Sequence, residues 1–438
     1  MSTKTLYLAE KPSQAMDIAR VLGIKARKDG YLELANGDVF TWAVGHLLEL
    51  AEPAKYQEAW GGRWSWAQLP MIPDAWKYEV NSRTRKQFTV IKALLKDVGR
   101  VVIATDAGRE GELIAREVLD YCRFRGAIQR LWTSSLVDTD IRKALASLKA
   151  DKDTRPLYEA ALARSRGDWL LGLSGTRAAT LAAGVRGDYF AMGRVKTPTL
   201  AMVVRRCEEV EGFAAKQYFE LEATAVTQQG QRIKLVHAPS EEDRLTTLEQ
   251  ANTRLARAKD FAGPLQVSVK EERESPPLPY SLPALQKDAN KALGFSAKKT
   301  LKTAQALYEK KAATYPRTDC QYLAESQIDE IPAVLKALEG GYSREVALVQ
   351  SMGVTARKTT FNNAKLTDHH GIIPTVATAA ELTEDERALY NLVCMRYLRT
   401  VAPDHRYEQT RVSVDANGVV FKAAGRRTLS PGWVHLGR

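Results

Sequence analysis

Cysteine is scarce in this sequence of 438 residues, and its few copies are widely spaced. Four cysteines without a CxxC pair supply neither a disulfide framework nor a zinc site of the usual spacing. The sequence also lacks an apolar run long enough to cross a bilayer, and its first residues lack the apolar core of a signal peptide. We therefore expect a cytoplasmic protein with no membrane partner. The four cysteines are Cys122, Cys207, Cys320 and Cys394.

Acidic residues are the minority charge. Asp and Glu number 52 against 64 Lys and Arg, which leaves a formal net charge of +12. An excess of this size attracts polyanions, and nucleic acid is the commonest such partner of a soluble protein. The alternative is a generally basic cytosolic protein with no such partner. A chain of this length buries more than one core, so we expect three or four domains.

Two segments in the first 150 residues begin as apolar strands and then break into polar residues. They are KTLYLAEK (4–11) and GRVVIATDAGREGELIAREVLDYC (99–122), and the second continues as a helix. Residues 84–99 between them have the pattern of an amphipathic helix. Strand–loop–helix units of this kind build a parallel sheet, which predicts an α/β domain over residues 1–150.

The remainder of the chain changes character several times. Residues 151–215 are mostly helical in pattern, and 216–275 alternate like strands around one helix near 248–259. ESPPLPYSLP (274–283) holds four prolines in ten residues, which is typical of a hinge or a domain crossing. Residues 276–400 are again helical in pattern, and short strands are expected over 401–438.

Acidic residues follow two of the predicted strands. Glu10 comes just after the first strand and Asp106 just after the later one, so both are expected at the carboxyl edge of the sheet. Glu110 follows in the first turn of the next helix. Three carboxylates converging on one cation would suit Mg²⁺, which prefers oxygen ligands. In the alternative, Asp106 caps the helix while Glu110 and Glu112 favour its positive end.

Two cations accompany these carboxylates. Arg109 and Lys11 each neighbour one of the acidic positions, as in a site that receives a phosphate group. A solvated surface lysine is the alternative for Lys11, because that is the usual state of the residue type.

A tyrosine stands in an unusual setting at ATYPRTDCQY (313–322), after a lysine-rich helix with Ser296 as its expected N-cap. Pro316 disfavours helical geometry at Tyr315, so Tyr315 and Arg317 would face the same side of an extended segment. A phenol is a weak nucleophile unless nearby charge stabilises its oxyanion, and arginine can also grip phosphate oxygens in a two-pronged contact. This combination suits attack on a phosphodiester. The alternative is a half-buried tyrosine with Arg317 paired to Asp319.

Two of the six histidines are adjacent, at DHHGIIPT. His369 and His370 lack partners at the spacing of a metal site. Hydrogen bonding to phosphate, acid–base work and structural packing all stay open for them.

Seven motifs occur in an order that resembles the type IA DNA topoisomerases, above all the bacterial topoisomerase III branch. They are LYLAEKPSQA, IATDAGREGELIA, ARSRGDWLLGLSGTRA, GRVKTPTLAMVV, LPYSLPALQ, AQALYEKKAATYPRTD and FNNAKLTDHHGIIPT, and the resemblance extends from Leu6 to about Trp433. It implies a multidomain fold with an N-terminal Toprim domain over 1–150, a helical DNA-binding domain over 151–215 and a tyrosine-bearing domain over 276–400. A β-rich arch over 216–275 and 401–438 would complete what is here an incomplete torus.

The resemblance also implies roles. Tyr315 would cut one strand and hold its 5′ phosphate, with Arg317 and Lys11 neutralising that phosphate. Glu10 would act as acid or base near the 3′ oxygen, and His369 matches the active-site histidine of the family. Glu10, Asp106 and Glu110 would hold Mg²⁺, chiefly to align the ends for resealing. DNA contacts are implied for Arg109, Arg164, Asp168, Arg194, Lys196, Thr197 and Gln305.

Resealing by exchange of one ester for another needs no ATP, and the sequence has no GxxxxGK[ST] loop. The resemblance implies relaxation or decatenation of DNA by a monomer associated with the nucleoid, with a preference for single strands and compatibility with a helicase partner.

The sequence departs from the family pattern at three places. Gly108 replaces the second acid of a DxD loop, so we expect one well-held Mg²⁺ rather than two. Lys196 replaces the usual glutamine, which adds a charge toward DNA. Family members continue past Gly432 and Trp433, so the resemblance implies a C-terminally truncated form without a zinc-ribbon tail, impaired in relaxation but not in chemistry.

Other functions fit parts of the sequence. A nuclease or primase with the same metal-binding fold would not need Tyr315. A catalytically impaired DNA-binding fragment would hold single strands through salt-sensitive contacts and form no covalent adduct. A tyrosine recombinase would use neither the carboxylates nor a 5′ linkage.

Overall fold

The computed structural model of the chain describes residues 4–133, 136, 138–184, 187–237, 239–240, 243–366, 369–377 and 381–437. The chain divides into two compact units. The first unit comprises Met1–Val204, Pro279–Gly341 and Lys358–Tyr397, and the second comprises Arg205–Leu278, Tyr342–Arg357 and Leu398–Arg438. One boundary, between Leu278 and Pro279, falls within the proline-rich segment.

A seven-stranded sheet of order β2-β3-β4-β1-β7-β8-β9 organises the N-terminal part of the first unit. Strands β4, β1, β7 and β8 are parallel to one another, while β2, β3 and β9 pair antiparallel at the two sides. This confirms the predicted α/β domain. The strands are β1 (Thr5–Ala9), β2 (Ile24–Lys28), β3 (Tyr31–Leu34), β4 (Val39–Trp42), β7 (Arg100–Ala104), β8 (Ala127–Arg130) and β9 (Lys149–Ala150).

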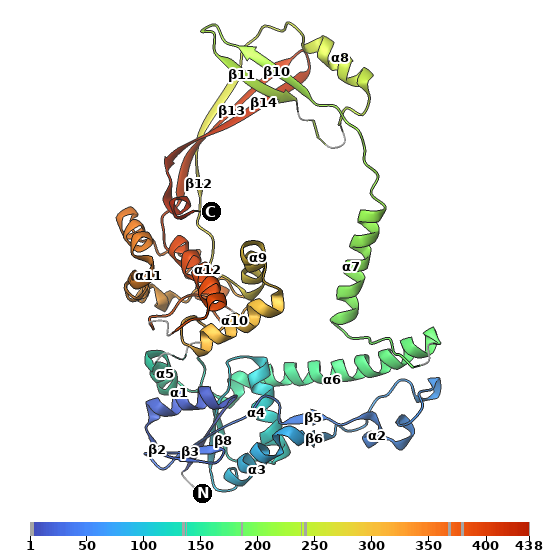
Figure 1. Cartoon of the computed structure of the whole chain (residues 1–438), viewed down its shortest axis with the longest axis vertical. Helices are drawn as coiled ribbons and strands as arrows, with labels where there is room; N and C mark the ends of the chain where they lie inside the picture. Colours follow the sequence, from blue (N-terminus) through green and yellow to red (C-terminus); the bar gives the residue numbers. More distant parts are fainter. Residues whose placement is uncertain are drawn as a thin grey trace. The chain divides into compact units, whose positions relative to one another are not determined.

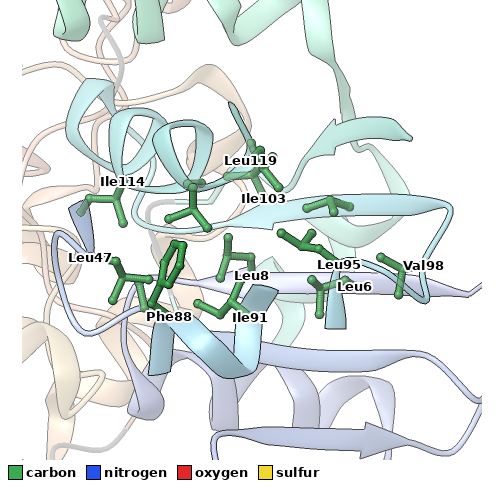
Figure 2. Packing of buried hydrophobic residues seen from close by; sticks show 14 of the residues in the cluster. Leu6, Leu8, Leu47, Phe88, Ile91, Leu95, Val98, Ile103, Ile114 and Leu119 are labelled. Carbon is green, nitrogen blue, oxygen red and sulfur yellow. The ribbon is translucent and has the colours of Figure 1, made fainter. Parts of the chain in front are cut away.

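Helices cover both faces of this sheet. Because side chains alternate along a strand, Leu6 and Leu8 of β1 pack with α3 (Arg85–Leu94) and α4 (Arg109–Tyr121), as Figure 2 shows. Tyr7 and Ala9 point the other way, into a core with α1 (Pro12–Leu22) and α5 (Asp138–Ala146). Both faces of β1 are therefore buried, as expected for a central parallel strand.

The rest of the first unit is mostly helical. A two-stranded sheet of β5 (Leu48–Leu50) and β6 (Tyr78–Val80) leads to a lobe with α2 (Pro53–Tyr56), whose Trp60 and Met71 pack on Trp169 of α6. Figure 1 shows α6 as one long helix. The helices beyond the N-terminal domain are α6 (Asp151–Ala183), α7 (Lys196–Glu211), α9 (Leu282–Leu293), α10 (Ala297–Glu309), α11 (Ile331–Met352) and α12 (Glu384–Thr400), and α7, α11 and α12 continue into the second unit. Ser296 caps α10 as predicted, accepting from the backbone N–H of Lys299.

The second unit contains a five-stranded antiparallel sheet of order β10-β11-β14-β13-β12, with α8 (Leu248–Ala258) packed beside it. The two β-rich segments of the sequence therefore share one sheet. Its last two strands are longer than the short strands predicted. Asn417 and Gly418 join them with φ of 56° and 84°, as a tight hairpin turn requires. The strands are β10 (Leu221–Val226), β11 (Arg232–His237), β12 (Gln266–Glu274), β13 (His405–Ala416) and β14 (Val419–Ser430).

The described part of the chain has no helix that is both long and apolar enough to cross a membrane. The division into four domains, one of them built from two segments, and the torus implied by the family stay predictions.

Candidate active site

Two neighbouring parallel strands bring the first two acidic residues together. Ala9 of β1 lies opposite Ala104 of β7, so the residues that follow them meet at the carboxyl edge of the sheet. The Glu10 Oε2 atom accepts a hydrogen bond of 3.2 Å from the backbone N–H of Asp106. Asp106 is buried, with 7% of its surface exposed.

Helix α4 begins close against the Asp106 backbone. Gly108, not Asp106, occupies its N-cap position, so the capping alternative for Asp106 is wrong. A Cβ atom added to Gly111 would lie 2.1 Å from the Asp106 carbonyl oxygen, which explains a glycine in this first turn. Glu110 lies in the same turn and pairs with Arg317 at 3.4 Å.

Two buried side chains that the sequence analysis missed hold this edge in place. The Gln14 side chain donates to Asp106 Oδ1 at 2.8 Å and accepts from the Glu10 backbone N–H at 3.0 Å. The fully buried Arg130 donates to the carbonyl oxygen of Asp106 at 2.7 Å and pairs with Glu112 at 2.6 Å. Arg130 is the last residue of β8, so the carboxyl-edge rule that located Asp106 would have located it too.

The tyrosine segment is extended, as predicted. Tyr315 and Arg317 are accessible on one side, while the residues that alternate with them, Thr314, Pro316 and Thr318, are buried. The segment is anchored to residues 371–375, since the backbone N–H of Thr314 donates to the Ile373 carbonyl oxygen at 3.0 Å.

This pairing brings His369 beside the phenol. The ring centroids of Tyr315 and His369 are 4.6 Å apart, and those of Tyr315 and Tyr308 are 5.4 Å apart. Arg317 pairs with Glu110, and no pair between Arg317 and Asp319 occurs among the described side chains.

One cavity of about 550 Å³ collects most of the predicted site residues, all from the first unit. Within it, Lys11 and Gln305 both reach Glu309 of α10, at 2.8 and 3.1 Å. The predicted residues that line the cavity are Glu10, Lys11, Asp106, Arg109, Glu110, Arg164, Gln305, Tyr315, Arg317 and His369.

The other predicted DNA contacts lie outside this cavity. Asp168 pairs with Arg164 at 3.8 Å and with Arg194 at 2.9 Å, so it connects the cavity wall to the segment before α7. Lys196 and Thr197 are accessible at the start of α7, where the Thr197 hydroxyl accepts from the Gly193 backbone N–H at 3.1 Å.

Burial and like charge shape the protonation of this cavity. Burial, followed by the Asp106 charge, raises the pKa of Glu10 to about 7. Burial also raises the pKa of Asp106, against the opposing charges of Lys11, Arg130 and Arg317. Burial lowers the pKa of His369 to about 4, so its imidazole is neutral at pH 7. In the protein alone, burial therefore disfavours the ionised form of both carboxylates.

The pKa of the Tyr315 phenol shifts in the direction opposite to that expected. Burial raises the pKa of Tyr315, the Asp106 and Glu10 charges raise it further, and only Arg317 opposes them. Nearby charge was expected to favour the oxyanion, but in the protein alone the neutral phenol is favoured. A cation or a proton transfer must therefore accompany any attack by this oxygen.

The acidic edge has the chemistry to hold a divalent cation. Among the described residues, no three His, Cys, Asp or Glu side chains are gathered closely enough to form a ready-made metal site. The pair of Glu10 and Asp106 nevertheless fits a cation, because bound positive charge would offset the burial and the Asp106 charge that together raise the pKa of Glu10. Oxygen ligands alone favour Mg²⁺ over zinc.

Comparisons with known proteins agree in sequence and in fold. A Toprim domain model matches residues 5–136, and a DNA topoisomerase model matches residues 152–437. The chain is 40% identical over 438 residues to DNA topoisomerase 3 of Shouchella clausii and 38% identical over 444 residues to that of Bacillus subtilis, covering 98% of this chain in both cases. It spans 59% of the length of these relatives. The full-length topoisomerase I of Thermotoga maritima has a similar fold, with a TM-score of 0.67 and 20% identity over 98% of this chain and 67% of that one.

Proposed function

Because the chain belongs to the type IA DNA topoisomerase family and resembles its topoisomerase III branch, we propose that it cuts and reseals one DNA strand through Tyr315. The observation that carries the proposal is the shared cavity, in which the phenol of Tyr315 and the carboxylates of Glu10 and Asp106 meet. Strand passage between cutting and resealing would relax or decatenate DNA without ATP.

The cutting step exchanges one phosphate ester for another. The Tyr315 oxygen gives up its proton to water and attacks the phosphorus, the bond from phosphorus to the 3′ oxygen breaks, and the 5′ phosphate stays on the tyrosine. Arg317 lies two residues along the same accessible side and would hold the non-bridging oxygens. Glu10, whose raised pKa lets it carry a proton near neutral pH, would protonate the leaving 3′ oxygen.

Two further residues would act on the scissile phosphate or the phenol. Lys11 pairs with Glu309 at 2.8 Å in the protein alone. With DNA bound, it would leave this partner, contact the phosphate and neutralise the phosphate charge. His369 packs against the Tyr315 ring and is neutral at pH 7, so it would orient the phenol or accept a hydrogen bond rather than supply charge.

Magnesium has a place in this scheme. Glu10, Asp106 and Glu110 would hold it, and it would supply positive charge that aligns the two ends of the cut strand for resealing. Gln14 and the Arg130 guanidinium would keep the Asp106 carboxylate and backbone in position for it.

Single-stranded DNA is the proposed partner at this cavity. Arg109, Arg164 and Gln305 line it, and the pairs of Asp168 with Arg164 and Arg194 connect its wall to Lys196 and Thr197. We propose that these residues guide a strand to Tyr315. Every residue in the scheme comes from one chain, so a monomer in the nucleoid suffices, and a helicase that exposes single strands is a compatible partner.

The decisive experiment asks for a covalent bond. We would incubate the protein with end-labelled single-stranded DNA, stop the reaction with detergent, and separate protein-linked DNA on a gel. The wild type is expected to retain label on a protein-linked 5′ end, and Tyr315→Phe is expected to retain none. Tyr308→Phe, which alters the neighbouring buried phenol, is the matched control.

Other outcomes distinguish the remaining functions. Cutting or priming that survives Tyr315→Phe would support a Toprim nuclease or primase instead. Salt-sensitive binding without any adduct in the wild type would indicate a DNA-binding fragment.

A further inference from the structure

A second cleft, of about 450 Å³, lies in the N-terminal domain away from the proposed active site. It is formed by the end of α3 and by the turn between α4 and β8. Gly99 and Gly126 in its wall precede β7 and β8, whereas Asp106 follows β7. The cleft is therefore at the amino edge of the parallel strands, opposite the edge that carries the carboxylates.

Every charged residue that lines this cleft is basic. Asp97 is adjacent in sequence but does not line it. Across the described ranges, none of the four lining cations forms an ion pair with a carboxylate. Around the active site, by contrast, Lys11 pairs with Glu309 and Arg317 pairs with Glu110. Positive charge is thus concentrated here without internal compensation. The four cations, all exposed, are Lys92, Lys96, Arg123 and Arg125.

Apolar groups line the wall between these cations. Leu95 and Val98, labelled in Figure 2, belong to the edge of the main core. The ring of the half-buried Phe124 lies against Gly126, where an added Cβ would be 2.4 Å from its Cζ atom. Cys122, also half-buried, completes this surface, and the opposing influence of Lys92 on the pKa of its thiol indicates that the two are near one another.

The combination of charge and apolar surface discriminates between polyanions. A phosphodiester pressed against an apolar wall loses water without gaining hydrogen bonds, which costs free energy. An apolar side chain gains about 25 cal/mol for each Å² it buries in the same place. A ligand with carboxylates around an apolar residue satisfies both parts of the cleft, because its charges meet the rim and its apolar group meets the wall.

We propose that this cleft docks an acidic peptide segment of a partner protein, one in which aspartates and glutamates flank an apolar side chain. The apolar side chain lies against Leu95, Val98 and Phe124, and the carboxylates pair with Lys92, Lys96 and the two arginines. Docking at the amino edge leaves the carboxyl edge open, so partner binding and DNA cutting occur on the same chain.

The first test measures binding by fluorescence anisotropy on the full chain. The probe is a labelled peptide of about ten residues, with Asp and Glu on both sides of a central Leu–Trp pair. Lys92→Glu with Lys96→Glu is expected to weaken binding about tenfold or more, the effect of reversing charges at a complementary rim. Lys25→Glu with Arg27→Glu makes the same charge change at exposed positions of β2 in the same domain and is expected to have little effect.

Two control ligands separate the contributions. A peptide with Ser–Gly in place of Leu–Trp is expected to bind more weakly, and so is one with Asn and Gln in place of the acids. The proposal would be overturned if the wild type did not bind the acidic peptide. It would also be overturned if the Lys92/Lys96 and Lys25/Arg27 double variants lost peptide affinity equally. Preferential binding of a single-stranded oligonucleotide, lost in the Lys92/Lys96 variant, would make the cleft a nucleic-acid site instead.

A local readout comes from Cys122. In a Cys207→Ser background, the remaining cysteines besides Cys122 are buried, so a thiol reagent reports mainly on the cleft. The acidic peptide is expected to slow modification of Cys122, and unchanged labelling at saturating peptide would contradict docking there. The Lys92/Lys96 variant is expected to form the Tyr315 adduct at the wild-type rate, which separates this proposal from that for the active site.

Discussion

At the scale of single residues, the phenol of Tyr315 is held in its neutral form by burial and by three carboxylates, and Arg317 alone opposes them. Its attack therefore depends on positive charge at the phosphate. We predict that Arg317→Gln slows adduct formation about 100-fold, the size of effect found when one charge-stabilising donor is lost, and that Arg317→Lys recovers part of it. The measurement is the rate of label transfer to protein from end-labelled single-stranded DNA.

Asp319→Asn is the matched control for Arg317, because Asp319 lines the same cavity from two residues farther along the segment. It removes a charge of opposite sign and is expected to leave the rate near that of the wild type. An Arg317→Gln protein that forms adduct as fast as the control would show that Arg317 does not neutralise the phosphate.

The raised pKa of Glu10 predicts a pH dependence of stability. Between its ordinary value of 4.5 and its folded value of about 7, the folded protein binds more protons than the unfolded chain. The free energy of unfolding contributed by Glu10 is therefore highest below pH 4.5 and is lost as the pH rises through 7. In magnesium-free buffer, Glu10→Gln is expected to be more stable than the wild type at pH 8 by about 1–3 kcal/mol, and equally stable near pH 4.

Magnesium should reverse the difference in stability between the wild type and Glu10→Gln at pH 8. Added at pH 8, it is expected to stabilise the wild type in urea denaturation, since it binds the folded carboxylates, and to have little effect on Glu10→Gln. A wild-type protein whose stability is insensitive to both pH and magnesium would show that Glu10 and Asp106 do not form a cation site.

At the scale of single elements, the start of α4 is fixed by a glycine. A Cβ at Gly111 would lie 2.1 Å from the Asp106 carbonyl oxygen and 2.8 Å from Thr105 Oγ1. We predict that Gly111→Ala destabilises the protein by about 1–3 kcal/mol or more, because backbone must move to admit the methyl group. The same movement displaces Asp106, so adduct resealing in magnesium should fall as well. Urea denaturation and a resealing assay measure the two effects.

Gly167 in α6 offers the matched comparison for Gly111. No atom lies within 4 Å of a Cβ added there, so Gly167→Ala is expected to stabilise the helix by about 0.5–1 kcal/mol. If both substitutions change the free energy of unfolding alike, the close approach of α4 to Asp106 does not constrain the fold.

Sequence patterns predicted a structural feature correctly where neighbouring residues determine that feature. The strand-then-acid pattern located Glu10 and Asp106 at one edge, the proline after Tyr315 predicted its extended backbone, and Ser296 predicted a helix start. Gln14 escaped prediction because it reaches Asp106 across 92 positions and no sequence pattern around it indicates the contact. Arg130 ends β8 at the same edge of the sheet as Asp106, so the carboxyl-edge rule could have placed it there, but no local pattern indicates its hydrogen bond to the Asp106 carbonyl oxygen.

At the scale of the whole molecule, the first unit is assembled from three stretches of the chain, and the proposed active site lies wholly within it. Sequence patterns separated the N-terminal domain from the segment that carries Tyr315, yet they contained nothing about how closely the two approach. That approach rests on ion pairs between residues distant in sequence, such as Asp17 with Lys311 and Lys11 with Glu309. The resemblance to a known family supplied this information, not the periodicity.

Ion pairs join the N-terminal domain to the tyrosine-bearing segment of the first unit. Lys11 pairs with Glu309 at 2.8 Å, and Asp17 pairs with Lys311 at 2.7 Å. Lys143 and Glu330 form a longer pair at 3.4 Å. Strand passage in the proposed reaction requires these two parts to separate and close again, and ion pairs suit a contact that must break and reform because water solvates both charges when it opens.

The pair of Asp17 and Lys311 provides a test of this contact. Each side chain is 22% exposed, so reversing one charge places two like charges in a poorly hydrated space. We predict that Asp17→Lys or Lys311→Asp alone lowers the adduct yield about tenfold, which corresponds to about 1.4 kcal/mol, and that the double reversal restores it. Aspartate is acceptable at position 311, whose φ of 61° is a conformation that Asp adopts more readily than most residues. The exposed pair of Lys28 and Glu33, which lies within one hairpin, is the control, and reversing it should change nothing. A double reversal no better than the single variants would show that this contact does not hold the tyrosine segment to the carboxylates.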